Sequence, residues 1–156
     1  MTRRREDDER TVASNRRARF DYAILERFEA GIQLTGGEVK SLRGGRASLA
    51  EAFARVRDGE AWLEGMHIPP YEAGDRRTHL AVRPRKLLLH RREIEELQAA
   101  QQQDRLAVVP LRVYFTHGLA KVELGLARGK RQHEKRQAIA KREHQREVER
   151  ELGRRR

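Results

Sequence analysis

The chain has 156 residues and no cysteine, and its 35 Lys and Arg against 24 Asp and Glu give a formal net charge of +11. The lack of cysteine excludes disulfides and thiolate-bound zinc or iron–sulfur clusters, and no stretch approaches the ~20 apolar residues of a membrane-spanning helix. The start lacks the apolar stretch of a secretory signal. We expect a soluble, cytoplasmic protein with a polyanionic partner, first of all nucleic acid.

The charge is unevenly distributed along the chain. Residues 1–14 hold four basic and four acidic side chains and show no apolar periodicity, which is typical of a disordered arm. Residues 15–127 carry a net charge of +4, and residues 128–156 carry 12 basic and five acidic side chains, a net +7. We therefore divide the chain into a disordered N-terminal arm, a folded body over 15–127 and a basic tail over 128–156.

The first half of the body predicts a strand followed by a short helix. Apolar and polar residues alternate from Phe20 to Leu34, with one imperfect position, as in a half-buried strand. Thr35 and Glu38 then have the spacing of a capping box, and Gly44 is a stop signal for the helix that follows.

Two hairpins and a second helix follow in chain order. Asp58-Gly59 is a strong hairpin signal between strands expected over 53–57 and 60–68. Residues 85–89 fit a strand or a helix, and a helix is expected over about 90–103. Residues 111–116 and 120–126 alternate around His117-Gly118, as in another hairpin. So many short antiparallel strands indicate a small closed barrel, with the two helices covering its open ends.

The tail is a different kind of segment. Its only large apolar residues are Ile139, Val148 and Leu152, which form no stripe that could dock on the barrel. It is nevertheless rich in helix formers and in Glu–Arg pairs three or four residues apart. We expect it to fray alone and to become helical when an anion accepts its charge.

The sequence offers no catalytic constellation. A nucleophile elbow and a zinc-protease helix motif are both absent, and the six histidines are scattered singly. Residues 37–41 resemble a phosphate-binding loop, but Val39 stands where that loop needs glycine. We expect a protein that is not an enzyme and that needs no cofactor and no metal.

Several motifs, in this order, resemble those of one family over residues 15–150. They are Asn15–Tyr22, Ala30–Arg43, Met66–Glu72, Arg85–His90 with Glu93-Ile94, Pro110-Leu111, Gly125–Lys130 and Lys135-Arg136. The chain is thereby similar to SmpB, the family of tmRNA-binding proteins of bacterial trans-translation. It departs from the family pattern at Gly37, where many members have a larger side chain, and at Glu134, which replaces an aspartate.

The resemblance implies an OB-like antiparallel barrel with two or three flanking helices and a tail that is helical when bound. It implies binding to the tRNA-like domain of tmRNA and delivery of that RNA to stalled ribosomes. Elongation factor Tu would take part indirectly, through the aminoacylated tmRNA. The tail would occupy the empty mRNA channel and the decoding region of the small subunit. The alternative is a general RNA-binding ribosomal or RNA-chaperone protein.

The resemblance also implies which residues bind. The expected tmRNA contacts are Asn15, Arg16, Arg17, Arg19, Tyr22, Glu38, Lys40, Arg43, Lys121, Arg128, Lys130 and Arg131. The expected ribosome contacts are His133, Glu134, Lys135, Arg136, Lys141, Arg142, Arg146 and Arg150. One patch is expected to collect Lys121, Arg128, Lys130 and Arg131.

Plain structural interpretations compete with several of these roles. Glu38 fits a helix cap as well as an RNA contact. Tyr22 fits core packing as well as stacking on a nucleotide. The basic residues before the first strand and in the tail fit solvated charge as well as phosphate binding.

Overall fold

The computed structural model describes residues 9–71, 79–130 and 132–154. Within them, seven strands form one antiparallel sheet in the order β1-β6-β3-β4-β5-β2-β7. Strand β6 also pairs with β7, which closes β2 to β7 into a ring, and β1 pairs with β6 alone. The strands are β1 (Arg10–Ser14), β2 (Tyr22–Ile32), β3 (Phe53–Arg57), β4 (Glu60–Glu64), β5 (Arg85–Leu88), β6 (Ala107–Thr116) and β7 (Leu119–Gly129).

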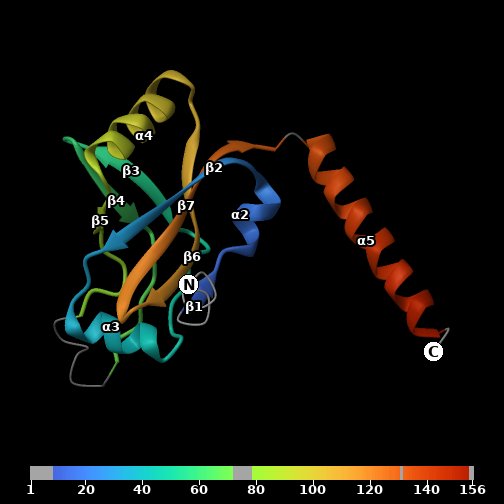
Figure 1. Ribbon diagram of the computed structural model, residues 1–156, viewed down its shortest axis with the longest axis horizontal. Helices are drawn as coiled ribbons and strands as arrows, with labels where there is room; N and C mark the ends of the chain where they lie inside the picture. Colours follow the sequence, from blue (N-terminus) through green and yellow to red (C-terminus); the bar gives the residue numbers. More distant parts are fainter. Residues whose placement is uncertain (1–8, 72–78, 131, 155–156) are drawn as a thin grey trace.

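The described chain has four helices, of which three lie against this ring and one extends away from it (Figure 1). The helix α2 (Arg16–Asp21) precedes β2, and α3 (Gly36–Arg43) follows it, so the two lie at opposite ends of the same strand. The helix α4 (Arg91–Gln103) packs on β3 and β6. The helix α5 (Gln132–Arg154), drawn in red, extends away from the ring.

The alternation in the sequence builds the core. Inward-facing side chains such as Phe28, Leu63, Leu87 and Leu124 are buried inside the ring. A smaller cluster under α2 gathers Ala18, Val109, Leu111 and Ala127. The core is therefore made mainly by period-two positions of the strands, as the sequence indicates.

Both predicted hairpins are confirmed, together with the chemistry of their turns. Asp58 and Gly59 have φ of 52° and 76°, and His117 and Gly118 have φ of 50° and 77°. Two successive residues at positive φ are the geometry of a two-residue type I′ turn, whose twist matches that of paired strands.

The N-terminal arm is where the prediction fails most clearly. Residues 10–14 of the expected disordered arm form β1, which pairs with β6; residues 1–8 lie outside the described part of the chain. Arg112 of β6 adds side-chain contacts to this pairing, because its guanidinium donates to Glu9 at 3.2 Å and to Thr11 at 3.2 Å. These partners are about a hundred positions apart in the sequence, so no local pattern reveals them.

Other boundaries also shift. Phe20 and Asp21, expected at the start of a strand, end α2 instead. The segment 85–88 is a strand, and the strand expected over 60–68 ends at Glu64. Strand β7 continues to Gly129 because its last residues pair with Tyr22 and Ala23, so the folded body extends two residues past the expected boundary at 127.

The ring is weakly closed between β3 and β6. A single residue pair, Ala54 with Val108, joins these two strands. The side chain of Gln101 on α4 takes over part of the missing pairing, because its amide donates to the Ala54 carbonyl at 3.0 Å and accepts from the Val56 N–H at 3.3 Å. Helix α4 thus supplies hydrogen-bond partners to backbone groups of β3 at this edge.

The tail, expected to become helical when bound, is helical over Gln132–Arg154. Its described side chains are exposed, including Ile139, Val148 and Leu152. None of the helices in the described ranges is long and apolar enough to cross a membrane.

Candidate nucleic-acid interface

Asn15 places helix α2 on the ring. Its carboxamide oxygen accepts the Ala18 N–H at 3.1 Å, which caps the helix, and its amide nitrogen donates to the carbonyls of Leu49 at 3.2 Å and Pro110 at 2.9 Å. The residue is 5 % exposed. The Asn15 amide is therefore buried and hydrogen-bonded within the protein, and its direct contact with RNA stays a prediction. Asparagine ahead of a helical run is a favoured N-cap, a signal that the sequence already contained.

Four basic residues meet where α2 comes beside the end of β7. Arg16 and Arg19 are exposed on α2. The ammonium of Lys130 donates to the Arg19 carbonyl at 3.2 Å, the Lys130 N–H donates to the Asp21 carbonyl at 2.9 Å, and Arg128 is exposed opposite Ala23. We call Arg16, Arg19, Arg128 and Lys130 the α2–β7 basic surface. Such a cluster can bind a chain of phosphates.

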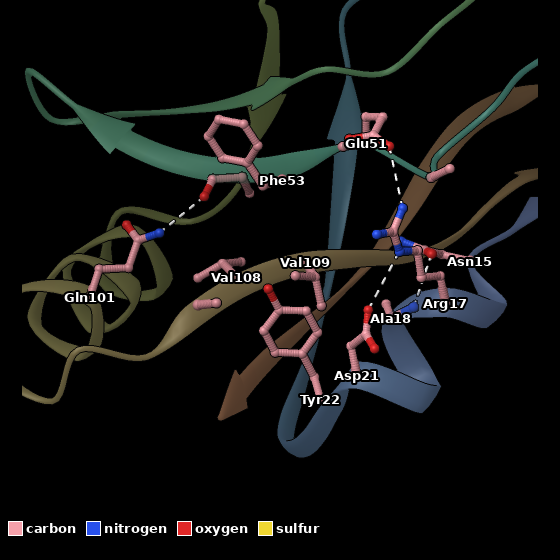
Figure 2. Close-up of a pocket in the computed structure, with 14 residues that line it drawn as sticks. Asn15, Arg17, Ala18, Asp21, Tyr22, Glu51, Phe53, Gln101, Val108 and Val109 are labelled. Atoms are coloured by element: carbon pink, nitrogen blue, oxygen red, sulfur yellow. Dashed lines mark hydrogen bonds and ion pairs between the residues drawn. The ribbon is translucent and has the colours of Figure 1, made fainter. Parts of the chain in front are cut away.

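Arg17 points elsewhere. Its guanidinium lies 3.5 Å from the Asp21 carboxylate and 3.3 Å from the Glu51 carboxylate. Figure 2 shows this bridge at the mouth of a groove between α2 and β3. Arg17 therefore joins α2 to the segment before β3, and its charge is already balanced by two carboxylates.

The groove beneath that bridge has a volume of about 450 Å³. Val108 and Val109 line it from β6, while Tyr22 and Phe53 approach from opposite sides (Figure 2). Tyr22 is half-buried, so it packs against the cluster under α2 and also faces the groove. Phe53 was missed by sequence reasoning, although the alternation of β3 already put it on the outer face, opposite the buried Ala54.

Glu38 is buried at the start of α3. The capping box is confirmed: Glu38 accepts the Thr35 N–H at 2.9 Å, and the Thr35 hydroxyl accepts the Glu38 N–H at 3.2 Å. The same carboxylate pairs with Arg83 and Arg85 at 2.5 Å each, and it is 1 % exposed. All of these donors belong to the protein itself, so a structural role accounts for the burial of Glu38, and its RNA contact stays a prediction.

Arg85 completes this buried group. It is fully buried, and beyond Glu38 it donates to the carbonyls of Met66 at 2.7 Å and Ala81 at 3.1 Å. Burial raises the pKa of Glu38, but the hydrogen bonds from Arg83, from the Thr35 N–H and from Arg85 outweigh that effect and hold its pKa below the ordinary value. The ion pair of Glu38 and Arg85 therefore joins α3 to the segments that precede and follow residues 72–78.

The remaining predicted contacts of the body lie at the α3 end of the ring. Lys40 and Arg43 are exposed on α3, with Lys40 5.8 Å from the ring of Tyr71 and Arg43 5.6 Å from that of Phe115. Because β2 has 11 residues, these cations lie about 30 Å along the strand from α2.

The expectation of a single patch around Lys121 is also wrong. Lys121 pairs with Gly31 near the α3 end of β2, whereas Arg128 pairs with Ala23 near the α2 end. Seven positions of strand separate Lys121 from Arg128, about 23 Å. The body thus has basic groups at two ends rather than one patch.

The tail helix begins next to the α2–β7 basic surface. The Arg142 guanidinium lies 6.0 Å from the ring of Phe20, which brings α5 beside α2. The exposed cations of the predicted set on this helix are Arg136, Lys141, Arg142, Arg146 and Arg150. Arg131 lies outside the described residues, as do the side chains of His133, Glu134 and Lys135.

No group of three or more histidine and acidic side chains in the described ranges could hold a metal ion. What this structure offers instead is exposed cations beside an aromatic-lined groove. Its chemistry is that of binding an anionic polymer.

Fold and site together define a small antiparallel β protein with a basic surface that continues into a basic helix. The family model described as SmpB protein matches residues 12–154. The chain belongs to this family.

Two named relatives and one solved structure are similar to this chain. The SsrA-binding protein of Mycobacterium sp. strain KMS is 61% identical over 144 residues, which is 92% of this chain and 86% of that protein. The SsrA-binding protein of Mycobacterium leprae strain TN is 57% identical over 155 residues, 99% of this chain and 97% of that protein. A chain of a solved structure reported as "tmRNA-SmpB: a journey to the center of the bacterial ribosome" is 50% identical with a TM-score of 0.65, covering 81% of this chain and 93% of that one.

Proposed function

We propose that this chain is a tmRNA-binding adaptor of trans-translation and not an enzyme. It binds the tRNA-like domain of tmRNA and brings it to stalled ribosomes in the cytoplasm, with elongation factor Tu taking part through the aminoacylated RNA. The observation that carries the proposal is the α2–β7 basic surface, continuous with a basic helix, in a chain of the SmpB family.

The two basic parts have different tasks in this proposal. The ring, as an OB-like barrel, presents Arg16, Arg19, Arg128 and Lys130 to phosphates of the tRNA-like domain, and Arg131 extends this set. The tail helix enters the empty mRNA channel, where His133 and Glu134 together with the cations Lys135, Arg136, Lys141, Arg142, Arg146 and Arg150 contact the decoding region of the small subunit. Phosphate contacts of this kind give binding that weakens steeply with salt.

The α3 end offers separate contacts. Lys40, Arg43 and Lys121 are too far from α2 to touch the same few phosphates, given about 30 Å along β2. In the proposal they meet a second stretch of the same RNA, or of the ribosome once the complex has docked.

The test is a salt titration of binding to the isolated tRNA-like domain, with an unrelated structured RNA as competitor. We expect selective binding, and we expect Arg16→Gln/Arg19→Gln to lower the slope of log K against log salt by about 1.4–1.8, since each lost phosphate contact removes roughly 0.7–0.9. The matched control is Arg91→Gln, an exposed arginine on α4 paired with Glu95, which should leave the slope unchanged.

Equal binding of the unrelated RNA would overturn the proposal. The chain would then be a general RNA-binding protein of the ribosomal or chaperone type.

A further inference from the structure

The groove between α2 and β3 has a different character from the α2–β7 basic surface next to it. At its mouth the single cation, Arg17, is balanced by Asp21 and Glu51. Two carboxylates against one guanidinium disfavour a phosphate at this point. An RNA strand whose phosphates bind Arg16 and Arg19 would therefore not place a further phosphate at the mouth of the groove.

The interior of the groove suits a flat apolar ring. Phe53 keeps 45 % of its surface exposed at one wall, Tyr22 lines the other, and Val108 and Val109 lie between them. Exposed aromatic side chains that flank an apolar floor are typical stacking platforms for unpaired bases. A volume of about 450 Å³ leaves room for one nucleobase with its sugar.

Hydrogen bonds within the protein fix the sides of the groove. Two buried or half-buried side-chain amides hold its sides: Asn15 fixes α2 to the carbonyls of Leu49 and Pro110, and Gln101 fixes the edge of β3 at Ala54. Gly65 packs closely against the segment that carries Glu51, since a Cβ there would lie 2.2 Å from the Glu51 carbonyl. The spacing of the two aromatic walls is therefore set by the fold.

We propose that this groove is a slot for a single unstacked nucleobase of the RNA whose phosphates lie on the α2–β7 basic surface. The inference rests on the proposed function and adds to it a mode of recognition. A base drawn out of a loop enters between Phe53 and Tyr22, while its flanking phosphates stay with Arg16 and Arg19. Sequence-specific reading of RNA relies on such splayed bases.

A double-mutant cycle tests the slot. The partners are full-length protein and a series of tRNA-like-domain RNAs, each with one abasic site at an unpaired position. We expect one abasic position to weaken wild-type binding by about 5- to 150-fold, the range for stacking of one base on an aromatic side chain. Phe53→Ala should weaken binding of the intact RNA to a similar degree and should lose little more with that abasic RNA.

Controls separate stacking from folding and from charge. Leu25→Ala removes a somewhat more exposed apolar side chain, 56 % exposed, from β2 outside the groove. This variant should bind as the wild type does. Phe53→Leu keeps an apolar side chain without the aromatic face and should recover only part of the affinity. Phe53→Ala should leave the salt slope unchanged, because it removes no phosphate contact, and its thermal midpoint reports whether the variant is still folded at the temperature of the binding measurement.

Two results would overturn the slot. Additive losses for Phe53→Ala and every abasic position, with selective binding intact, would reject the slot and leave the proposed function standing. Absence of selective binding by the wild-type protein would reject both.

Discussion

Glu38 shows how much a single buried carboxylate can connect. Its spacing from Thr35 predicts the capping box, and that part is confirmed. Its ion pairs with Arg83 and Arg85 join residues 45 and 47 positions apart, which no local pattern reveals. A buried charge pair of this kind stabilises little by its presence but costs much when one partner is removed.

Glu38→Ala is expected to lower the free energy of unfolding by about 3–5 kcal/mol, because Arg85 would keep its buried charge without a partner. Glu38→Gln should lose less, since it can still accept hydrogen bonds. Denaturant unfolding measures both. Glu60→Gln, which affects a half-exposed pair with Lys86, should cost no more than about 1 kcal/mol. If Glu38→Gln kept full stability and lost RNA affinity, the carboxylate would be an RNA contact after all.

Acid should destabilise the protein through this group. Hydrogen bonds from Arg83, from the Thr35 N–H and from Arg85 outweigh burial and keep the pKa of Glu38 below its ordinary value. A depressed folded-state pKa gives stability that is present above the unfolded pKa, about 4.3, and is lost as pH falls through the folded pKa. Denaturation curves from pH 6 to pH 2 should fall over that window, and the fall should be shallower in Glu38→Gln. An identical acid profile in the variant would contradict this assignment.

At the scale of elements, α2 depends on its surroundings. Six residues are too few for a helix to be stable alone in water. The helix persists because Asn15 caps it and ties it to two other segments, and because Lys130 holds its last turn. The same ties present Arg16 and Arg19 on one face. The basic surface is therefore a property of packing, although its residues are adjacent in the sequence.

Asn15→Asp separates the two tasks of that residue. Aspartate still caps the helix, but it cannot donate to the carbonyls of Leu49 and Pro110, and a buried group left unsatisfied costs about 1–3 kcal/mol. We expect lower stability, and lower affinity for the tRNA-like domain because Arg16 and Arg19 are held less firmly on the ring. Lost affinity with unchanged stability would instead show that Asn15 itself contacts RNA.

At the scale of the whole molecule, charge is divided among three places. The α2–β7 basic surface and the cations of α3 lie at opposite ends of β2, and α5 carries a third set away from the ring (Figure 1). Only the first of these continues directly into the tail helix. A protein that bridges two RNAs needs such a separation, since one site must stay free while the other is occupied.

Lys135→Ala/Arg136→Ala should abolish peptide tagging on stalled ribosomes while binding to the tRNA-like domain survives, because these cations belong to the tail. Reconstituted tagging and direct RNA binding measure the two properties separately. Arg154→Ala/Arg155→Ala removes the same charge from the end of the tail and should tag normally. Loss of RNA binding together with tagging would contradict the division of labour.

The sequence by itself determined the elements whose signals are local. Alternation gave most of β2, β6 and β7, turn residues gave both hairpins, and capping spacing gave α3. The motifs and their order along the chain predicted the family, and the charge count predicted the basic tail.

Only the tertiary structure decided the features that join distant residues. It ordered β1 through pairing with β6, buried Asn15 and Glu38, and placed Lys121 about 23 Å along β7 from Arg128. It also brought Tyr22 and Phe53 to one groove. The reason is physical: burial and the distance between strands depend on which segments pair across the ring, and pairing is set by the sum of many long-range contacts rather than by any short stretch.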